Sequence, residues 1–283
     1  MSRASVRGIE LNYEVIGDRG PWIAFTPGSR RAYAELVPLS KKIAEHGYRV
    51  LLHDRRNCGA SEVAIEPLGS EHEMWADDLH ALAALLGARP LCVGGSSAGA
   101  RLAILFALRH PQATSGMLLW RVTGGAAATE ELAESYYGSF IKLAQHGGMQ
   151  AVCESEHFRA CIAARPANRD KLMRMKPGEF IDVMAMWRNK FLEAANLPII
   201  GATEAELGSI QVPVCLIAGN DRIHPPAIAR KVHRLLRNAE LHDDVVEKRA
   251  DHDLKHEWEP AEWRSREDAM AQIFVEFLRR RLR

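Results

Sequence analysis

The sequence lacks an excess of charge of either sign. It holds 37 Lys and Arg residues against 36 Asp and Glu residues, which gives a formal net charge of +1. A protein that binds nucleic acid or an anionic membrane surface usually carries a basic excess. We therefore expect a small-molecule substrate, with neither nucleic acid nor a membrane as partner. The oligomeric state stays open, a homodimer being one option.

Long apolar runs and a cysteine framework are also missing. No stretch approaches the ~18 consecutive apolar residues of a transmembrane helix, and the N-terminus MSRASVRGIE lacks the apolar core of a signal peptide. The five cysteines form no CxxC pair, which argues against a structural zinc site and a disulfide framework. These features predict a cytoplasmic protein without a bound metal.

Short β-rich runs alternate with longer helical stretches, a pattern typical of an α/β fold with a mostly parallel sheet. Eight strands are predicted: SVRG and IELNYEVIG at the start, then WIAFT (22–26), RVLLHD (49–54), LCVGG (91–95), MLLWRV (117–122), VCLIAG (214–219) and VVEKR (245–249). Helical periodicity fills most of the intervals between them.

One interval is too long for a simple crossover. About 90 residues separate MLLWRV from VCLIAG, and a structureless loop of that length is rare in a compact domain. The sequence therefore predicts a core domain of residues 1–122 and 211–283, interrupted by a helical cap, or lid, of residues 123–210.

The segment GSSAG (95–99) fits the motif G-x-S-x-G and lies between a predicted strand and a predicted helix. Gly95 and Gly99 would let strand and helix approach closely around a turn that exposes the Ser97 hydroxyl. Ser96 is the neighbouring alternative, but it lacks the symmetric glycine frame. A turn without catalytic function is the other interpretation, so Ser97 as nucleophile depends on a base and an acid elsewhere in the chain.

Candidates for both follow later strands. Asp221 comes directly after VCLIAG, at the strand end where open α/β sheets place functional side chains, although an Asp before Pro is also ordinary turn chemistry. His252 follows the last predicted strand and is the predicted base. His256 is the alternative base, and the two histidines with neighbouring aspartates would also suit a metal site, but no HExxH motif accompanies them.

The chain order serine, acid, histidine resembles that of the α/β-hydrolase superfamily. Other segments are similar to sequence motifs typical of that family: GIELNYEVIGDRGPWIAFTPG, HDRRNCGAS, WADDLHALAALLGA, AGNDRIHPP and DHDLKHEWEP. The last is similar to the family's G-H-x-x-x-x-E pattern with Asp251 in place of Gly, and this favours His252 over His256. In the family an insertion at the position of residues 123–210 is a helical cap that builds the acyl or leaving-group pocket.

The resemblance also implies an oxyanion hole built from the backbone N–H groups of Ser29 and Ala98. Pro27 and Gly28 stand where many relatives carry His-Gly. Because the implied donors belong to the backbone, loss of that histidine is compatible with activity.

Arg30 and Trp187 are the candidate substrate-binding residues. Arg30, together with Arg31, would attract a carboxylate-bearing substrate if it faces the pocket; a solvated loop is the alternative. Trp187 lies among aromatic and Met residues that would line an apolar pocket, although core packing gives the same composition. The loop DRRNCGAS is interpreted as a hydrogen-bonded support for the site, with Cys58 structural.

The predicted function is that of a serine hydrolase that cleaves a small carboxylic ester, thioester or lactone through an acyl-serine, without a cofactor. Two alternatives use the same triad: a C–C bond hydrolase of a vinylogous diketone and a cofactor-free perhydrolase with haloperoxidase-like activity. A non-catalytic ligand receptor on the same fold is the alternative from another class, because a fold alone does not fix an activity.

Overall fold

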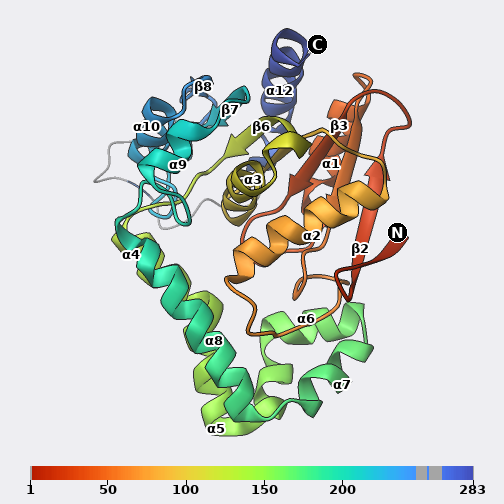
Figure 1. Cartoon of the computed structure of the whole chain (residues 1–283), viewed down its shortest axis with the longest axis vertical. Coiled ribbons are helices and arrows are strands. Elements are labelled where there is room, and N and C mark those ends of the chain that lie inside the picture. Colours follow the sequence, from red (N-terminus) through yellow and green to blue (C-terminus); the bar gives the residue numbers. More distant parts are fainter. Residues whose placement is uncertain (1, 247–253, 255–262, 283) are drawn as a thin grey trace.

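An eight-stranded sheet forms the centre of the molecule in the computed structural model, which describes residues 2–246, 254 and 263–282 (Figure 1). Its strands are β1 (Ser2–Val6), β2 (Ile9–Ile16), β3 (Trp22–Thr26), β4 (Arg49–His53), β5 (Leu91–Ser96), β6 (Thr114–Trp120), β7 (Val214–Ile217) and β8 (Ala239–His242). They are ordered β1-β2-β4-β3-β5-β6-β7-β8. The pairs β1-β2 and β2-β4 are antiparallel, and the other pairs are parallel. The predicted mostly parallel α/β sheet is confirmed.

The last strand lies earlier than predicted. β8 is Ala239–His242, whereas the sequence pattern favoured 245–249. Val245 and Val246 are buried against the sheet but belong to no strand, and residues 247–249 lie outside the described part of the chain. The sequence pattern missed Ala239–His242 because, among the described residues, β8 pairs with β7 alone and is half-buried, so it contains no continuous apolar run.

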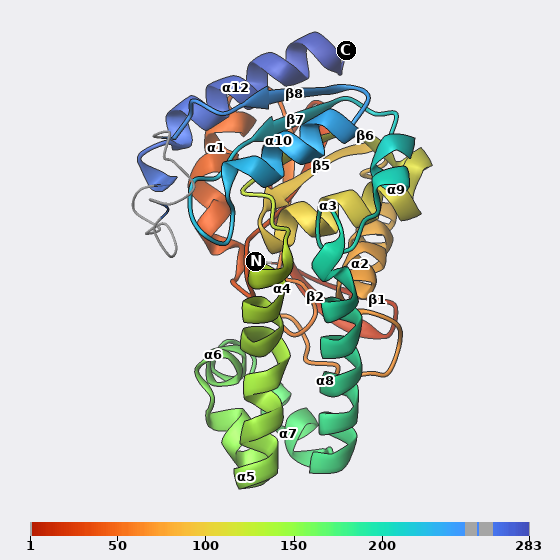
Figure 2. The ribbon, with the colours of Figure 1, turned by 90° about the vertical axis from the view of Figure 1, so that its left-hand side faces the viewer.

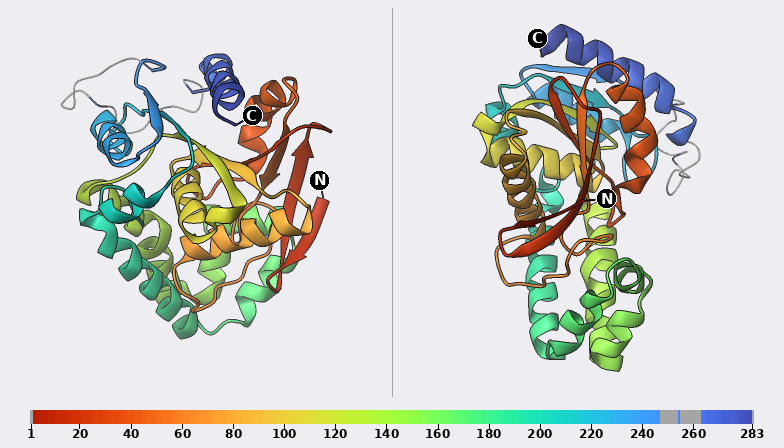
Figure 3. Two further views of the ribbon diagram at one scale, coloured as in Figure 1. Left: turned by 45° about the horizontal axis from the view of Figure 1, so that its top comes forward. Right: turned by 90° about the vertical axis from the view of Figure 1, so that its right-hand side faces the viewer.

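Helices cover both faces of the sheet (Figure 3). On one face lie α1 (Val37–Ala44) and α12 (Glu267–Arg281). On the other lie α2 (Glu71–Leu85), α3 (Ala98–Arg109) and α10 (Pro226–Leu235), and short 3-10 turns, η1 (Tyr33–Leu36) and η2 (Pro111–Ala113), precede α1 and β6.

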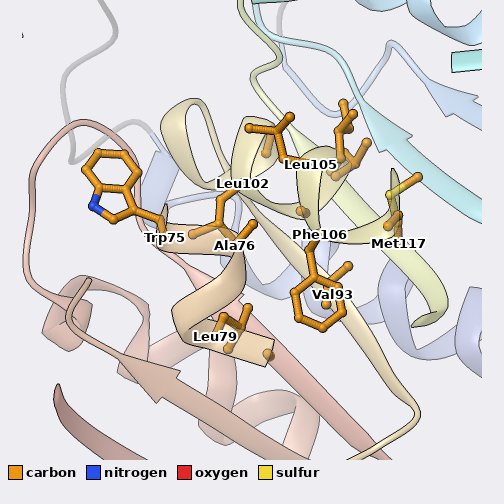
Figure 4. Close-up of a cluster of buried hydrophobic side chains, with 14 of the residues drawn as sticks. Trp75, Ala76, Leu79, Val93, Leu102, Leu105, Phe106 and Met117 are labelled. Carbon is orange, nitrogen blue, oxygen red and sulfur yellow. The ribbon is translucent and has the colours of Figure 1, made fainter. Parts of the chain in front are cut away.

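The packing of α2 and α3 on the sheet fixes the position of the sharp turn at Ser97, between β5 and α3. Their contact is apolar and buried, and its side chains come from both helices and from the underlying strands (Figure 4): Trp75, Ala76, Leu79, Val93, Leu102, Leu105, Phe106 and Met117. At the start of α2, Ser70 and Glu73 form a reciprocal capping box, which satisfies backbone N–H groups of the first turn.

Between β6 and β7 the chain leaves the sheet and forms a helical insertion (Figure 2). Its elements are α4 (Ala126–Ala133), the π-helical turn η3 (Glu134–Gly138), α5 (Ser139–Glu154), α6 (Glu156–Ala164), α7 (Ala167–Arg174), α8 (Pro177–Leu192), the 3-10 turn η4 (Glu193–Asn196) and α9 (Glu204–Ser209). α5 packs against α8 around an apolar cluster of its own, to which Val63, Ile65 and Met74 of the sheet domain contribute. Leu207 of α9 instead belongs to the apolar core between the sheet and helices α2 and α3. None of the helices that the structure describes is long and apolar enough to cross a membrane.

Candidate active site

Ser97 lies at the sharp turn between β5 and α3. Its φ of 52° and ψ of −110° are strained for a residue with a side chain, a feature that concentrates at functional sites. A Cβ atom on Gly95 would lie 2.4 Å from the carbonyl oxygen of Thr26, and one on Gly99 would lie 2.0 Å from the same oxygen. Both glycines are therefore required for β3, β5 and α3 to approach one another around Ser97.

A histidine and an aspartate complete a hydrogen-bonded chain with this serine. Nε2 of His224 lies 2.9 Å from Oγ of Ser97, and its Nδ1 lies 2.8 and 3.0 Å from the two carboxylate oxygens of Asp221. All three residues are buried. With Nδ1–H donating to the carboxylate, Nε2 presents its lone pair to the serine hydroxyl, as a general base requires.

The turn after β7 holds the acid in place. Backbone N–H groups of Ile223 and His224 donate to Oδ1 of Asp221 at 3.0 and 2.9 Å, and Nη2 of Arg121 donates to Oδ2 at 3.2 Å. Burial alone would raise the pKa of Asp221, but the hydrogen bonds and charge of His224 and the charge of Arg121 outweigh it and lower this pKa below its usual range. The carboxylate therefore stays ionised and able to stabilise a protonated imidazole.

The sequence predicted two of these three residues. Ser97 and Asp221 are brought together, and the histidine that joins them is His224, which the sequence reasoning missed. The signal was present in NDRIHPP, where a histidine follows the aspartate by three residues in a tight turn. His252 and His256 lie outside the described residues, so His252 as base stays a prediction.

Ser97 and His224 open on a cavity of about 220 Å³. Ser29 and Arg31 of the loop after β3 line one side, and Glu131 and Tyr136 of the insertion line another. Ser29, a predicted oxyanion donor, thus shares a cavity with the nucleophile. Ala98, the other predicted donor, is the first residue of α3, where backbone N–H groups have no acceptor within the helix.

Arg30 lies in an internal ion pair. Its Nη1 and Nη2 donate to the two carboxylate oxygens of Glu71 at 2.9 and 2.6 Å, and its guanidinium lies within 6 Å of the ring centres of Trp75, Tyr136 and Tyr137. Burial opposes the charged form, but Glu71 raises the pKa of Arg30 above its usual value. The structure thus gives this guanidinium a carboxylate of the protein itself, and Arg30 joins the sheet domain to the insertion.

Trp187 is 1% exposed and packs edge-on against Tyr137. Both line a second cavity, of about 160 Å³, together with His72 and Phe191. Trp187 is not among the described residues that line the Ser97 cavity. Its predicted contact with substrate would have to occur in the second cavity.

The loop after β4 supports the site from beneath. Asp54 accepts from the backbone N–H groups of Tyr33 and Ala60, and Nη2 of Arg55 lies 3.4 Å from the carbonyl oxygens of Gly28 and Arg31. The loop that carries Ser29 is therefore tied to β4. In the same loop, burial raises the pKa of the Cys58 thiol to about 11, so it remains protonated at neutral pH.

One group of possible metal ligands occurs among the described residues: Cys215, Glu240 and His242 place ligand atoms within 4.8 Å of one another on β7 and β8. Glu240 is already paired with Arg280 at 3.0 Å, and burial raises the pKa of the Cys215 thiol. This cluster offers no set of free anionic ligands.

Comparison with known proteins agrees with this geometry. The family model described as "alpha/beta hydrolase fold" matches residues 26–257. The chain belongs to the α/β-hydrolase family. It is accordingly a hydrolase, and the α/β fold class that the sequence predicted is confirmed.

Relatives of this α/β hydrolase include five proteins named proline iminopeptidase, two of which are described next. The protein from Lactobacillus acidophilus is 23% identical over 249 residues, which cover 80% of this chain and 83% of the relative. That from Lacticaseibacillus rhamnosus is 25% identical over 254 residues, covering 81% and 84%.

Solved structures show the same fold. The enol-lactonase from Burkholderia xenovorans matches with a TM-score of 0.64 and 20% identity, covering 98% of this chain and 99% of that one. The meta-cleavage product hydrolase from Pseudomonas fluorescens matches with a TM-score of 0.67 and 18% identity, covering 99% and 98%.

Proposed function

We propose that this α/β hydrolase cleaves a small carboxylic ester, thioester or lactone through an acyl-serine intermediate. The observation that carries the proposal is the continuous chain of hydrogen bonds from Ser97 through His224 to Asp221. Nucleophile, base and oxyanion donors are all groups of the protein, so the proposed reaction proceeds without a cofactor.

In the first half-reaction Oγ of Ser97 attacks the substrate carbonyl while Nε2 of His224 accepts the hydroxyl proton. Asp221 stabilises the imidazolium, and the backbone N–H groups of Ser29 and Ala98 donate to the oxyanion. The proton then passes from His224 to the leaving oxygen or sulfur, and the acyl-serine remains.

In the second half-reaction a water molecule takes the place of the leaving group. His224 accepts its proton, the hydroxide adds to the acyl carbon, and collapse of the intermediate releases the carboxylic acid and returns the proton to Ser97. Residues 123–210 form the cap in this proposal, because Glu131 and Tyr136 of the insertion enclose the site. The cavity of about 220 Å³ is smaller than the pockets that bind drug-sized ligands, which favours a small acyl group.

A second candidate is removal of an N-terminal proline, the activity that the names of the relatives state for those proteins. Glu131 lines the Ser97 cavity, with its carboxylate 3.7 Å from Nη2 of Arg222, and would be the group that meets a substrate ammonium. Hydrolysis of proline 4-nitroanilide at a higher kcat/KM than 4-nitrophenyl acetate would favour this candidate over the ester hydrolase.

Covalent labelling with a small fluorophosphonate tests the proposal, with the adduct located by peptide mapping. We expect one adduct, on Ser97, in the wild type and in the Ser96→Ala control, and none in Ser97→Ala. His224→Asn should label at least about 10³-fold more slowly, because the serine loses its base. No adduct on folded wild-type protein would refute the serine mechanism.

The His252→Asn variant decides between the two histidines. If His224 is the base, this variant labels at close to the wild-type rate. Loss of labelling in His252→Asn together with retention in His224→Asn would overturn the assignment of His224 and leave the serine hydrolase intact.

A further inference from the structure

Arg101 is a buried arginine whose guanidinium makes no hydrogen bond of good geometry to the described residues. It lies on α3, is 1% exposed, and none of its Nε, Nη1 and Nη2 atoms has a partner among the described residues. Its guanidinium carbon lies 5.1 Å from the centre of the Phe191 ring. A cation–π contact offsets only a small part of the desolvation of a buried charge. The described residues therefore leave most of the desolvation cost of this guanidinium uncompensated.

The surroundings of Arg101 hold more positive than negative charge. Arg30 and Arg55 approach from the sheet domain, and Nε and Nη1 of Arg55 also have no partner among the described residues. Glu71 is the carboxylate bonded within this group, and Arg30 already uses both of its oxygens. Burial, and then the charges of Arg101, Arg30 and Arg55, hold the pKa of His72 well below its usual value, so His72 is neutral.

Arg101 also lies beside the walls of both cavities. Phe191, which its guanidinium faces, lines the cavity of about 160 Å³, together with Lys190. The ring of Tyr136 packs against that of Phe191, with 5.9 Å between the ring centres, and Tyr136 lines the Ser97 cavity. Along α3 the Cα atom of Arg101 lies one turn, about 6 Å, from that of Ser97.

We propose that Arg101 binds a carboxylate carried by the substrate itself, a few carbon atoms from the carbonyl that Ser97 attacks. The planar guanidinium matches a carboxylate with two parallel hydrogen bonds, and a buried charge-assisted pair is among the strongest polar contacts. The substrate class is then a monoester, thioester or lactone of a dicarboxylic acid. This inference rests on the proposed function and names the acyl group.

Binding without turnover provides the first test. In the Ser97→Ala variant, calorimetric titration with monomethyl glutarate, which carries one carboxylate, is compared with dimethyl glutarate, which carries none. We expect the anionic ester to bind at least about tenfold more tightly. Equal affinity for the two esters overturns the inference, whether or not the enzyme acts on either.

The second test adds variants of the arginine to Ser97→Ala. Arg101→Met removes the charge at similar volume and should reduce the affinity for monomethyl glutarate at least about tenfold while leaving dimethyl glutarate within about twofold. Arg169→Met is the matched control, because Arg169 is an exposed arginine of the insertion bonded to Gln150. An equal loss for both esters in Arg101→Met would show a structural role only.

Turnover gives the third test, with mono-4-nitrophenyl glutarate and 4-nitrophenyl pentanoate as charged and neutral substrates of similar length. In the wild type kcat/KM should favour the glutarate ester, and Arg101→Met should lose that preference through a higher KM. If Arg101→Met fails to fold, Arg101→Lys retains the charge without the planar fork and should weaken the preference at least about fivefold. Turnover without any preference for the charged ester refutes this inference and supports the proposed function. Absence of fluorophosphonate labelling on Ser97 refutes the proposed function instead.

Discussion

Glu71 holds the junction between the sheet domain and the insertion, and a single change there tests how that junction is stabilised. Its carboxylate lies at the first residue of α2, is 1% exposed, and accepts hydrogen bonds from Arg30, Asn57 and Tyr137. The substitution Glu71→Gln preserves the shape of the side chain. It removes the negative charge that faces Arg30.

The expected loss follows from the burial of the pair. The Arg30 side chain is 7% exposed and that of Glu71 0%. Loss of one partner of a buried pair costs about 3–5 kcal/mol, because the other charge is left uncompensated. Arginine does not escape this cost by deprotonation, because its guanidinium stays charged in proteins. Glutamine keeps one acceptor oxygen, so we expect a loss of about 3 kcal/mol in the free energy of unfolding, measured by urea denaturation at pH 7.

Two comparisons make this measurement decisive. Glu179→Gln removes one partner of an exposed pair with Lys176 on α8 and should cost less than about 0.5 kcal/mol. The double variant Arg30→Met/Glu71→Gln should recover much of the loss, because no unpaired charge remains. A loss below about 1 kcal/mol in Glu71→Gln, or strict additivity in the double variant, would mean that the buried pair of Arg30 and Glu71 does not stabilise this junction.

Two further predictions concern the turn around Ser97 and the pH dependence of stability. Gly99→Ala should reduce the free energy of unfolding by about 3 kcal/mol, because the new Cβ would meet the backbone of Thr26. The control is Gly178→Ala on α8, where no atom of the described residues lies within 4 Å of the Cβ position, and it should change the free energy by less than about 1 kcal/mol. Similar losses for the two variants in urea denaturation would contradict this. Burial, and then the charge of Arg55, lowers the pKa of His53 to about 3. Below pH 6.5 the unfolded chain therefore binds a proton at His53 that the native protein does not bind. The free energy of unfolding falls as the pH decreases from 6.5 towards 3. At pH 5 this amounts to about 2 kcal/mol, and His53→Leu should show a correspondingly smaller loss between pH 7 and 5; parallel losses in the two proteins would disprove it.

How far the sequence predicts this molecule depends on how local each signal is. The central strands, such as WIAFT and LCVGG, are recognisable because burial on both faces requires a continuous apolar run. Ser97 is recognisable because its glycine frame is local, and Asp221 because it directly follows β7. β8 was not predicted, because a half-buried edge strand does not require a continuous apolar run.

The polar contacts were less accessible to prediction. His224 is three residues from Asp221 in sequence, but its role depends on a turn that aims its ring at a serine 127 residues away. The partner of Arg30 is Glu71, 41 residues distant, and its identity depends on how α2 packs beside the loop after β3. The surroundings of Arg101 depend on the placement of the insertion over α3. No sequence pattern encodes such long-range pairings.

The π-helical turn η3 sets a constraint on how this pocket can change. Its consecutive residues Tyr136 and Tyr137 are both buried, and they face the Ser97 cavity and the second cavity respectively. Such a turn corresponds to one extra residue in an α-helix, and each residue of an α-helix advances the direction of its side chain by about 100°. Deleting one residue here would therefore rotate α5 by about that angle relative to α4 and break its packing against α8. A change of length at η3 would thus disturb both cavities and the α5–α8 packing at once, whereas a substitution of Tyr136 or Tyr137 alters the lining of a cavity and leaves the helix directions unchanged.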